Sequence, residues 1–244
     1  MISAVLILLV TLSSGFYPFF KKKQSSIPLR LPAAEAMGTG VFLGAGIIHM
    51  LSDSASQFSS LHIEYPLTFL LAGVTFILLL YLEHIGKELH HHKPSSTASF
   101  AILSTTMLSI HSFLAGAALG FANSVTFTVV ILIAIISHKW AASFSLALQI
   151  TKSDLKFKKA LSLFIVFSLM APLGVLFGSE ISSYMQASPL IVPTFTALAA
   201  GTFIYLGSLH GLERGVLVKE CCNLKMFYFV ILGFSLMAIV AIWT

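Results

Sequence analysis

A small set of ionisable side chains lies inside long apolar stretches of this sequence, where a charged or polar group is costly and usually functional. The set is rich in histidine and comprises His49, Asp53, Glu83, His84, His111, His138, Lys139, His210 and Glu213. Imidazole nitrogens bind zinc, copper, iron and nickel well, whereas carboxylates and water suit calcium and magnesium. The residue types therefore indicate chemistry with a divalent transition-metal ion.

His111 and His138 carry the strongest part of this pattern. A helix rises about 1.5 Å per residue, which places each imidazole roughly 20 Å from the start of its own apolar stretch. The two stretches are consecutive and cross in opposite directions, so both side chains fall near the middle of a membrane. A single buried histidine often does no more than hydrogen-bond a neighbouring helix. Two at one depth favour a shared metal ion, with the Ser112 hydroxyl as a third and weaker ligand.

Other ionisable residues extend this pair into a series of candidate metal ligands at successive depths across the membrane. His49 and Asp53 lie one helical turn apart in the outer half of their stretch, and His210 and Glu213 share a face at the inner end of theirs. Residues 90–92 are three consecutive histidines on the inner side. We include His49, Asp53, His210 and Glu213 among the candidate metal ligands. Each group could also be a hydrogen-bonded or solvated turn at the membrane surface, and the sequence leaves both interpretations open.

Two further features have more than one interpretation. Glu83 and His84 lie at the inner end of a stretch, where together with Lys87 one turn later they can simply reach the lipid headgroups. Lys139 directly follows His138. Its side chain could neutralise a carboxylate, occupy the place of a second cation, or extend to the membrane surface.

The composition requires elements that cross a bilayer. The 244 residues are 57% hydrophobic and only 9% charged, against about 25% charged residues in an ordinary soluble domain, which excludes a water-soluble globule. The two cysteines are adjacent, at positions 221 and 222, and cannot staple a disulfide scaffold. Basic residues fall in short clusters with no aromatic-interleaved surface, so we expect no nucleic-acid partner.

A spanning helix needs about 20 mostly apolar residues, and the sequence predicts an all-α, single-domain membrane protein over residues 1–244. The predicted spans are 2–20, 36–56, 66–86, 99–122, 125–149, 158–178, 190–212 and 226–243. All but one of the 14 Lys and Arg residues lie in the connections after the odd-numbered spans or, for Lys158 and Lys159, at the first two residues of the next span, and the exception is Lys139. Because such residues concentrate on the cytoplasmic side, we expect both termini outside.

Four segments in order resemble the ZIP (Zrt/Irt-like) metal-ion transporter family. The fourth span contains residues 111–120, HSFLAGAALG, and the fifth contains residues 138–146, HKWAASFSL. The family pattern in the fourth span is His, then Asn or Ser, then after two residues Glu or Asp, followed by Gly-x-Ala-x-Gly, and one branch of the family begins its fifth-span motif with His-Lys. Residues 42–51, FLGAGIIHML, and 198–206, LAAGTFIYL, resemble the second and seventh spans of the family.

This resemblance implies eight helices with both termini outside, in which helices 1–3 and 6–8 form an inverted repeat, a common device of transporters. It also implies a metal site between the fourth and fifth helices and a histidine-bearing cytoplasmic loop after the third. Members of the family carry zinc, iron, manganese or related ions into the cytoplasm. Zinc is the ion we expect here, with iron and manganese as alternatives.

Two carboxylates of the family pattern are missing from this chain. Ala115 stands where the fourth span would carry an acidic residue, and Ala142 stands four residues after His138, where many relatives have Glu. Without anionic ligands a divalent ion is costly to bind at low dielectric, so binding should be weak. His111, Ser112 and His138 would need water, or an acidic residue such as Asp53, to complete a four-coordinate zinc.

The function that follows is inward transport of zinc or a similar divalent ion, taken up at Asp53 and His49 and passed to the central pair. The ion is then released to a cytoplasmic cluster of Glu83, His84, His210 and Glu213. The ion is cargo, so we expect no resident cofactor. We place the chain in the cell membrane, inner or plasma, with the bilayer and the metal ion as partners, and the sequence leaves a homodimer open. The main alternative is a transport-degenerate relative that acts as a metal sensor or scaffold. An intramembrane enzyme is not expected, since His-Glu-x-x-His and Gly-x-Ser-x-Gly motifs are absent.

Overall fold

A computed structural model of the chain describes residues 2–24, 31–89, 97–122, 124–184, 188–209 and 224–242, and these residues form helices joined by short connections, with no strand. The helices are α1 (Ile2–Gln24), α2 (Pro32–Gly44), η1 (Ala45–Met50), α3 (Leu51–Ser60), α4 (Leu67–Leu89), α5 (Thr97–Gly120), α6 (Val125–Lys152), α7 (Phe157–Tyr184), α8 (Ile191–Tyr205) and α9 (Leu224–Val240).

The observed helices match the predicted spans. Seven helical segments are long and apolar enough to cross a membrane, one of them the continuous run of α2, η1 and α3 over Pro32–Ser60, and α9 is a shorter apolar helix over Leu224–Val240. The all-α membrane fold is therefore confirmed. The exact count of eight spans and the placement of both termini outside stay predictions.

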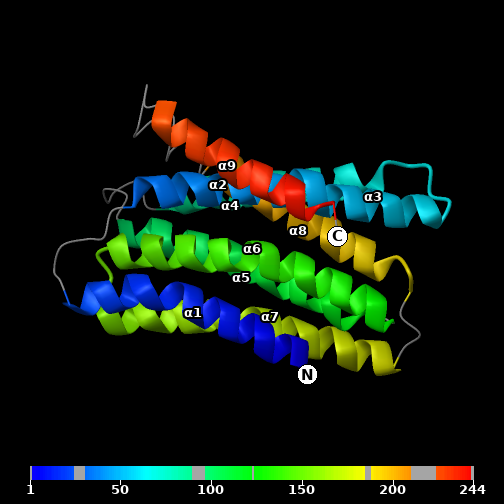
Figure 1. Cartoon of the computed structure of the whole chain (residues 1–244), viewed down its shortest axis with the longest axis horizontal. Coiled ribbons are helices and arrows are strands. Elements are labelled where there is room, and N and C mark those ends of the chain that lie inside the picture. Colours follow the sequence, from blue (N-terminus) through cyan, green and yellow to red (C-terminus); the bar gives the residue numbers. More distant parts are fainter. Residues whose placement is uncertain are drawn as a thin grey trace.

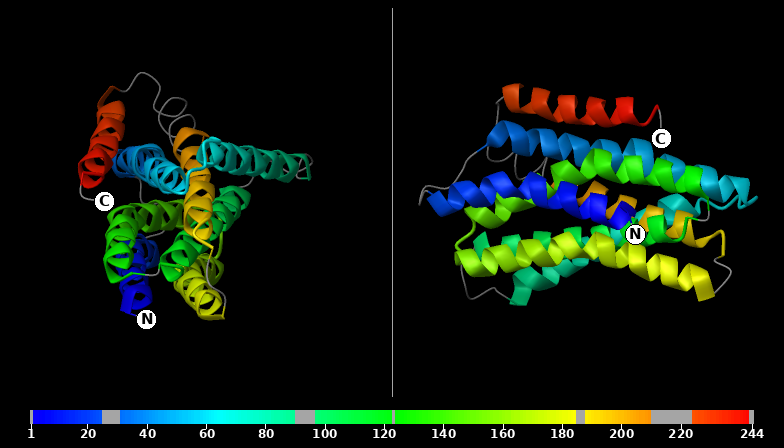
Figure 2. Two further views of the ribbon diagram at one scale, coloured as in Figure 1. Left: turned by 90° about the vertical axis from the view of Figure 1, so that its right-hand side faces the viewer. Right: turned by 60° about the horizontal axis from the view of Figure 1, so that its bottom comes forward.

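The helices associate as two bundles that lie side by side (Figure 1, Figure 2). The first bundle consists of α1, α5, α6 and α7, and the second of α2, η1, α3, α4, α8 and α9. Contacts between the bundles run mainly through α5 with α8 and α2 with α6. The predicted metal pair therefore lies on helices at the boundary between the bundles.

Close packing inside each bundle depends on glycine. Two pairs of glycines bring the backbones of α5 and α7 into contact, at Gly116, Gly120, Gly174 and Gly178. A Cβ atom at any of these positions would collide with the backbone of the facing helix. Gly40 on α2 and Gly233 on α9 make the same kind of contact in the second bundle. Small residues spaced in this way are typical of tightly associated membrane helices.

The packing pairs repeat in a way that fits the expected inverted repeat. α1 packs on α6, and α7 packs on α5; likewise α2 packs on α9, and α8 packs on α4. The first three spans (α1; α2 with η1 and α3; α4) can be exchanged in order with the last three (α7; α8; α9), and α5 with α6. Under this exchange each of the four packing pairs becomes another of the four. α1 and α7, which correspond in this exchange, lie side by side and run in opposite directions (Figure 1), as an inverted repeat requires.

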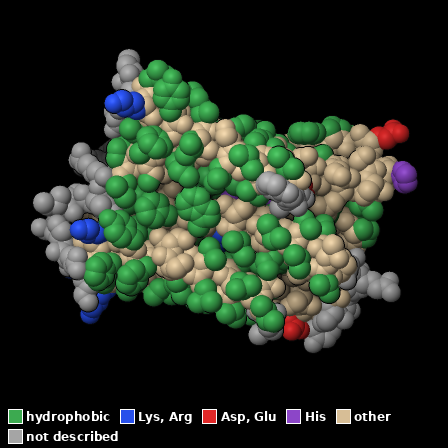
Figure 3. All heavy atoms as spheres, viewed as in Figure 1, with side chains coloured by type: hydrophobic (Ala, Val, Ile, Leu, Met, Phe, Trp, Pro, Cys, Tyr) green, Lys and Arg blue, Asp and Glu red, His purple; other side chains and the backbone are tan. Residues whose placement is uncertain are grey.

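The outer surface is apolar along the length of the molecule. On the face shown in Figure 3, hydrophobic side chains cover the middle, Lys and Arg lie toward the end where α1 and α6 terminate, and acidic side chains lie at the opposite end. This distribution agrees with a bilayer around the middle and with the basic side that the sequence predicts as cytoplasmic.

Candidate functional site

His111 on α5 and His138 on α6 come together in the interior, as the sequence predicts. Each is only 2% exposed, and their ring centres lie 5.8 Å apart with the planes nearly perpendicular, at 71°. Phe203 of α8 lies against both rings, stacked on His111 at 3.6 Å and edge-on to His138 at 4.9 Å. The pair thus sits where both bundles meet.

The surroundings of His111 determine which of its nitrogens is free. Nδ1 lies 2.7 Å from the Thr202 hydroxyl oxygen and 3.1 Å from the carbonyl oxygen of Ala199. The Thr202 hydroxyl donates its own hydrogen to that carbonyl at 2.6 Å, so its oxygen accepts from His111. Nδ1 therefore carries the hydrogen, and Nε2 keeps the lone pair that a metal ion requires. Phe203 fixes the ring plane.

His138 differs from His111 in lacking such partners. Both of its ring nitrogens are buried, and neither makes a well-formed hydrogen bond with any residue that the structure describes; the backbone carbonyl of Ala134, one turn earlier, is near enough to accept only a weak one. A buried polar group without a partner is costly and calls for an explanation. One explanation is that His138 binds a cation, because His138 also lines a cavity.

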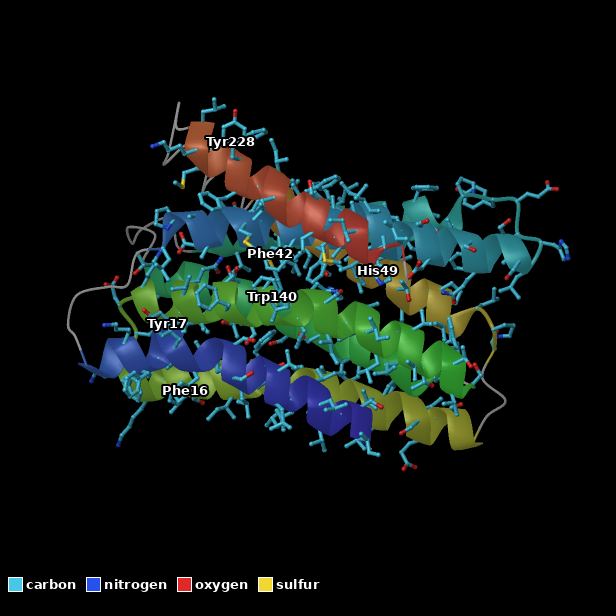
Figure 4. The ribbon with its side chains drawn as sticks, in the orientation of Figure 1. Phe16, Tyr17, Phe42, His49, Trp140 and Tyr228 are labelled. Carbon is cyan, nitrogen blue, oxygen red and sulfur yellow. The ribbon has the colours of Figure 1, made fainter. Side chains whose placement is uncertain are left out.

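His49 and Asp53 lie along the same cavity, at the junction between η1 and α3. Their side chains form a pair, with 3.1 Å between His49 Nδ1 and Asp53 Oδ2. His49 belongs to η1, a π-helical turn, and such turns inside α-helices occur frequently at functional sites. In Figure 4 His49 lies in the interior of the second bundle, next to α8. It is also close enough to His138 to interact electrostatically.

The cavity has a volume of about 270 Å³ and is lined by α3, α5, α6 and α8 together with η1. Its polar lining consists of His49, Asp53, Ser56, Gln57, His138 and Thr196. His138 lies at the middle of α6, and the other five residues belong to the half of the molecule that lies away from the basic end. The cavity therefore gives His138 an approach from the side predicted to be outside, past the His49 and Asp53 pair.

The two alanines that replace family carboxylates occupy different surroundings. Ala115 lines the cavity, whereas Ala142 is 2% exposed and belongs to the apolar core. A carboxylate at position 115 would consequently face the cavity directly.

Lys139 lies beside the histidine pair and is itself buried, with 3% exposure. Its Nζ donates to the Ser112 hydroxyl at 2.7 Å and lies 4.4 Å from the ring centre of Phe167. It forms no ion pair with the residues described. The side chain thus does not extend to the membrane surface, and the hydroxyl that we consider a weak metal ligand already accepts a hydrogen bond from Lys139.

The structure describes only some of the candidate ligands predicted at the inner side of the membrane. His210, Glu213 and the histidines at 90–92 lie outside the described residues. Glu83 is 2% exposed and accepts a hydrogen bond from the Tyr205 hydroxyl, whereas the neighbouring His84 is exposed. Nowhere in the described ranges do three His, Cys, Asp or Glu side chains form a group that could hold a metal ion.

Sequence reasoning missed the contributions of Thr202 and Phe203. Both belong to residues 198–206, the segment that resembles the seventh span of the family. That segment contains no Asp, Glu, Lys, Arg or His, so no charged group or imidazole at membrane depth marks either residue in the sequence.

Sequence comparison relates the chain to known zinc transporters. A sequence model described as ZIP zinc transporter matches residues 1–106 and 86–241. Human zinc transporter ZIP2 is 26% identical over 85% of this chain and 84% of its own length. Zebrafish (Danio rerio) zinc transporter ZIP1 is 36% identical over 64% of this chain and 50% of its length. Protein zntD of Dictyostelium discoideum is 34% identical over 66% of this chain and 25% of its length. The chain is a multi-pass membrane protein that belongs to the ZIP zinc transporter family.

Proposed function

We propose that this protein transports zinc across the membrane toward the cytoplasm and that His138 and His111 bind the ion at the centre. The observation that carries the proposal is His138, whose two buried nitrogens have no well-formed hydrogen bond and which lines a cavity shared with His49 and Asp53. The names of the relatives support zinc as the cargo. Iron and manganese remain the alternative ions.

The steps follow from the chemistry of the ligands. Asp53 supplies the negative charge that first attracts the ion, and His49 shares it. The ion then passes to His138 and the Nε2 atom of His111, while water completes its coordination, as in zinc sites with few protein ligands. Alternating exposure of the central pair to the two sides of the membrane moves the ion across.

Uptake of radiolabelled zinc into proteoliposomes tests the proposal, with iron, manganese and cobalt as competitors. We expect saturable zinc uptake by the wild type and loss of uptake in His138→Ala and His111→Ala. Thermal unfolding of each variant in detergent controls for misfolding. Failure of the folded wild type to take up any of these ions would refute the proposal.

A second function is favoured by one specific observation. The described residues contain no group of three strong metal ligands, and Lys139 lies next to the central pair. Both features suit a membrane protein that senses a metal ion or serves as a scaffold without moving the ion. Folded wild-type protein that binds zinc in a titration but fails to transport it would support this second function.

A further inference from the structure

One face of α6 forms a continuous row from the central site to the basic end of the molecule. The row consists of His138, Ala142, Ser145, Gln149 and Lys152, at alternating spacings of four and three residues. Residues at such spacings share a face, because the helix turns about 100° per residue. The exposed large apolar residues of α6, Val125, Val129 and Ile133, all precede this row, and residues 138–152 are buried or half-buried. A small and polar row in the interior of an apolar protein needs a separate explanation.

α2 packs over this row, and its residue that faces Ser145 has no side chain. Gly38 of α2 faces the Ser145 hydroxyl so closely that a Cβ atom at position 38 would collide with it. Farther toward the basic end, Glu35 of α2 forms an ion pair with Lys152. We call the interface between α2 and this row of α6 the seam. Since α2 and α6 belong to different bundles, the seam can open while the glycine-mediated contacts within each bundle stay intact.

Between Gly38 and the ion pair lies Gln149, whose side-chain oxygen is buried and accepts no hydrogen bond from the part of the chain that the structure describes. His138, at the other end of the row, is 2% exposed and also lacks well-formed partners. Unpartnered polar atoms are costly in a closed protein interior. They become favourable when the seam holds water or a cation, for which an amide oxygen is a suitable ligand.

The cavity and the row together divide the path into two halves. The cavity reaches His138 from the side away from the basic residues, while the row continues from His138 to the opposite side, where Ala142 and Ser145 are buried at 2% and 6% exposure. The structure is thus open on one side of His138 and closed on the other.

We propose that the α2 and α6 seam is the route by which the divalent cation leaves His138, with Gln149 and Glu35 as oxygen ligands and the Glu35–Lys152 ion pair as the closure. This inference rests on the proposed function. When the seam opens, the ion pair breaks, and the Glu35 carboxylate is released from Lys152 to face the departing ion. In the closed state Lys152 neutralises Glu35 and keeps cations from entering from the basic side.

Cysteine accessibility tests the route independently of transport. In a background with Cys221→Ser and Cys222→Ser, we would introduce Gln149→Cys and measure its reaction with an impermeant methanethiosulfonate applied to the basic side of vesicles. The matched control is Thr151→Cys, because Thr151 lies at the same depth on the opposite face of α6 and is buried. We expect position 149 to react and position 151 to stay unreactive.

The ion pair provides a second measurement. Lys152→Met should accelerate the reaction at position 149 about twofold to fivefold. A partly exposed ion pair typically changes the population of one conformation, here the one with the seam open, by about this factor. The exchanged pair Glu35→Lys with Lys152→Glu should restore the slow reaction. Any variant that fails to fold is recognised by size-exclusion chromatography and replaced by Glu35→Gln, which also breaks the pair.

The outcomes distinguish this inference from the proposed function. Equal reactivity at positions 149 and 151, or no acceleration by Lys152→Met and Glu35→Gln, would overturn the seam as the route even if the wild type transports zinc. Absence of zinc uptake by the wild type in the same vesicles would refute the proposed function, whatever the cysteines show.

Discussion

Thr202 should position His111 for metal binding through a single hydrogen bond. Thr202→Val keeps the shape of the side chain but removes the hydroxyl that lies 2.7 Å from His111 Nδ1. Groups that orient a metal-binding histidine typically contribute 10-fold to 100-fold to metal affinity. Because the Ala199 carbonyl at 3.1 Å still accepts from Nδ1, we expect a loss of about tenfold, equivalent to about 1.4 kcal/mol.

The assay compares this variant with Thr105→Val on α5. Thr105 is equally buried, at 3% exposure, but its hydroxyl donates within its own helix, to the Ala101 carbonyl at 2.7 Å. We would measure the zinc dependence of initial uptake in proteoliposomes and zinc binding by calorimetry in detergent. Thr202→Val should raise the zinc concentration for half-maximal uptake, whereas Thr105→Val should not. Equal effects of the two substitutions would refute the assignment of the free nitrogen on His111.

Four further predictions follow from the site and its packing. His138→Ala should abolish saturable zinc uptake, and uptake at the wild-type rate would remove this residue from the path. Lys139→Met should strengthen zinc binding, since it removes a group that repels a cation when protonated; weaker binding in a calorimetric titration would contradict this. Ala115→Asp should also strengthen binding, because position 115 faces the cavity, and an unchanged affinity would argue against a cation in that cavity. Gly116→Ala should destabilise the protein by about 1–3 kcal/mol through collision with α7, whereas a Cβ atom at Gly73 meets nothing within 4 Å and Gly73→Ala should be nearly neutral in thermal unfolding.

The spans and the central pair could be predicted because each depends on a property that is local in sequence. Apolar length and the position of Lys and Arg define a span without reference to its neighbours. The depths of His111 and His138 follow from counting residues at a constant rise. Two consecutive helices that cross in opposite directions then bring equal depths close together, and the structure confirms this proximity.

Interactions between distant segments could not be predicted in the same way. Thr202 reaches His111 across 91 positions of sequence, and nothing in its own helix marks it as a partner. The environment of Lys139 likewise depends on Ser112 and Phe167, which α5 and α7 bring to it. Three interpretations of Lys139 were compatible with the sequence because they differ only in tertiary contacts.

The absence of carboxylates at the centre is physically consistent with transport. A divalent ion between two neutral imidazoles at low dielectric lacks a compensating charge, so the centre binds it less tightly than an acidic site would. Permeation requires binding that is strong enough for the ion to enter and weak enough for it to leave. The compensating charges lie instead on the second bundle, at Asp53 on the cavity side and Glu35 on the opposite side, whereas both His111 and His138 belong to the first. Under the proposed function, a displacement of one bundle against the other would change which carboxylate the bound ion meets, and this change would favour uptake in one arrangement and release in the other.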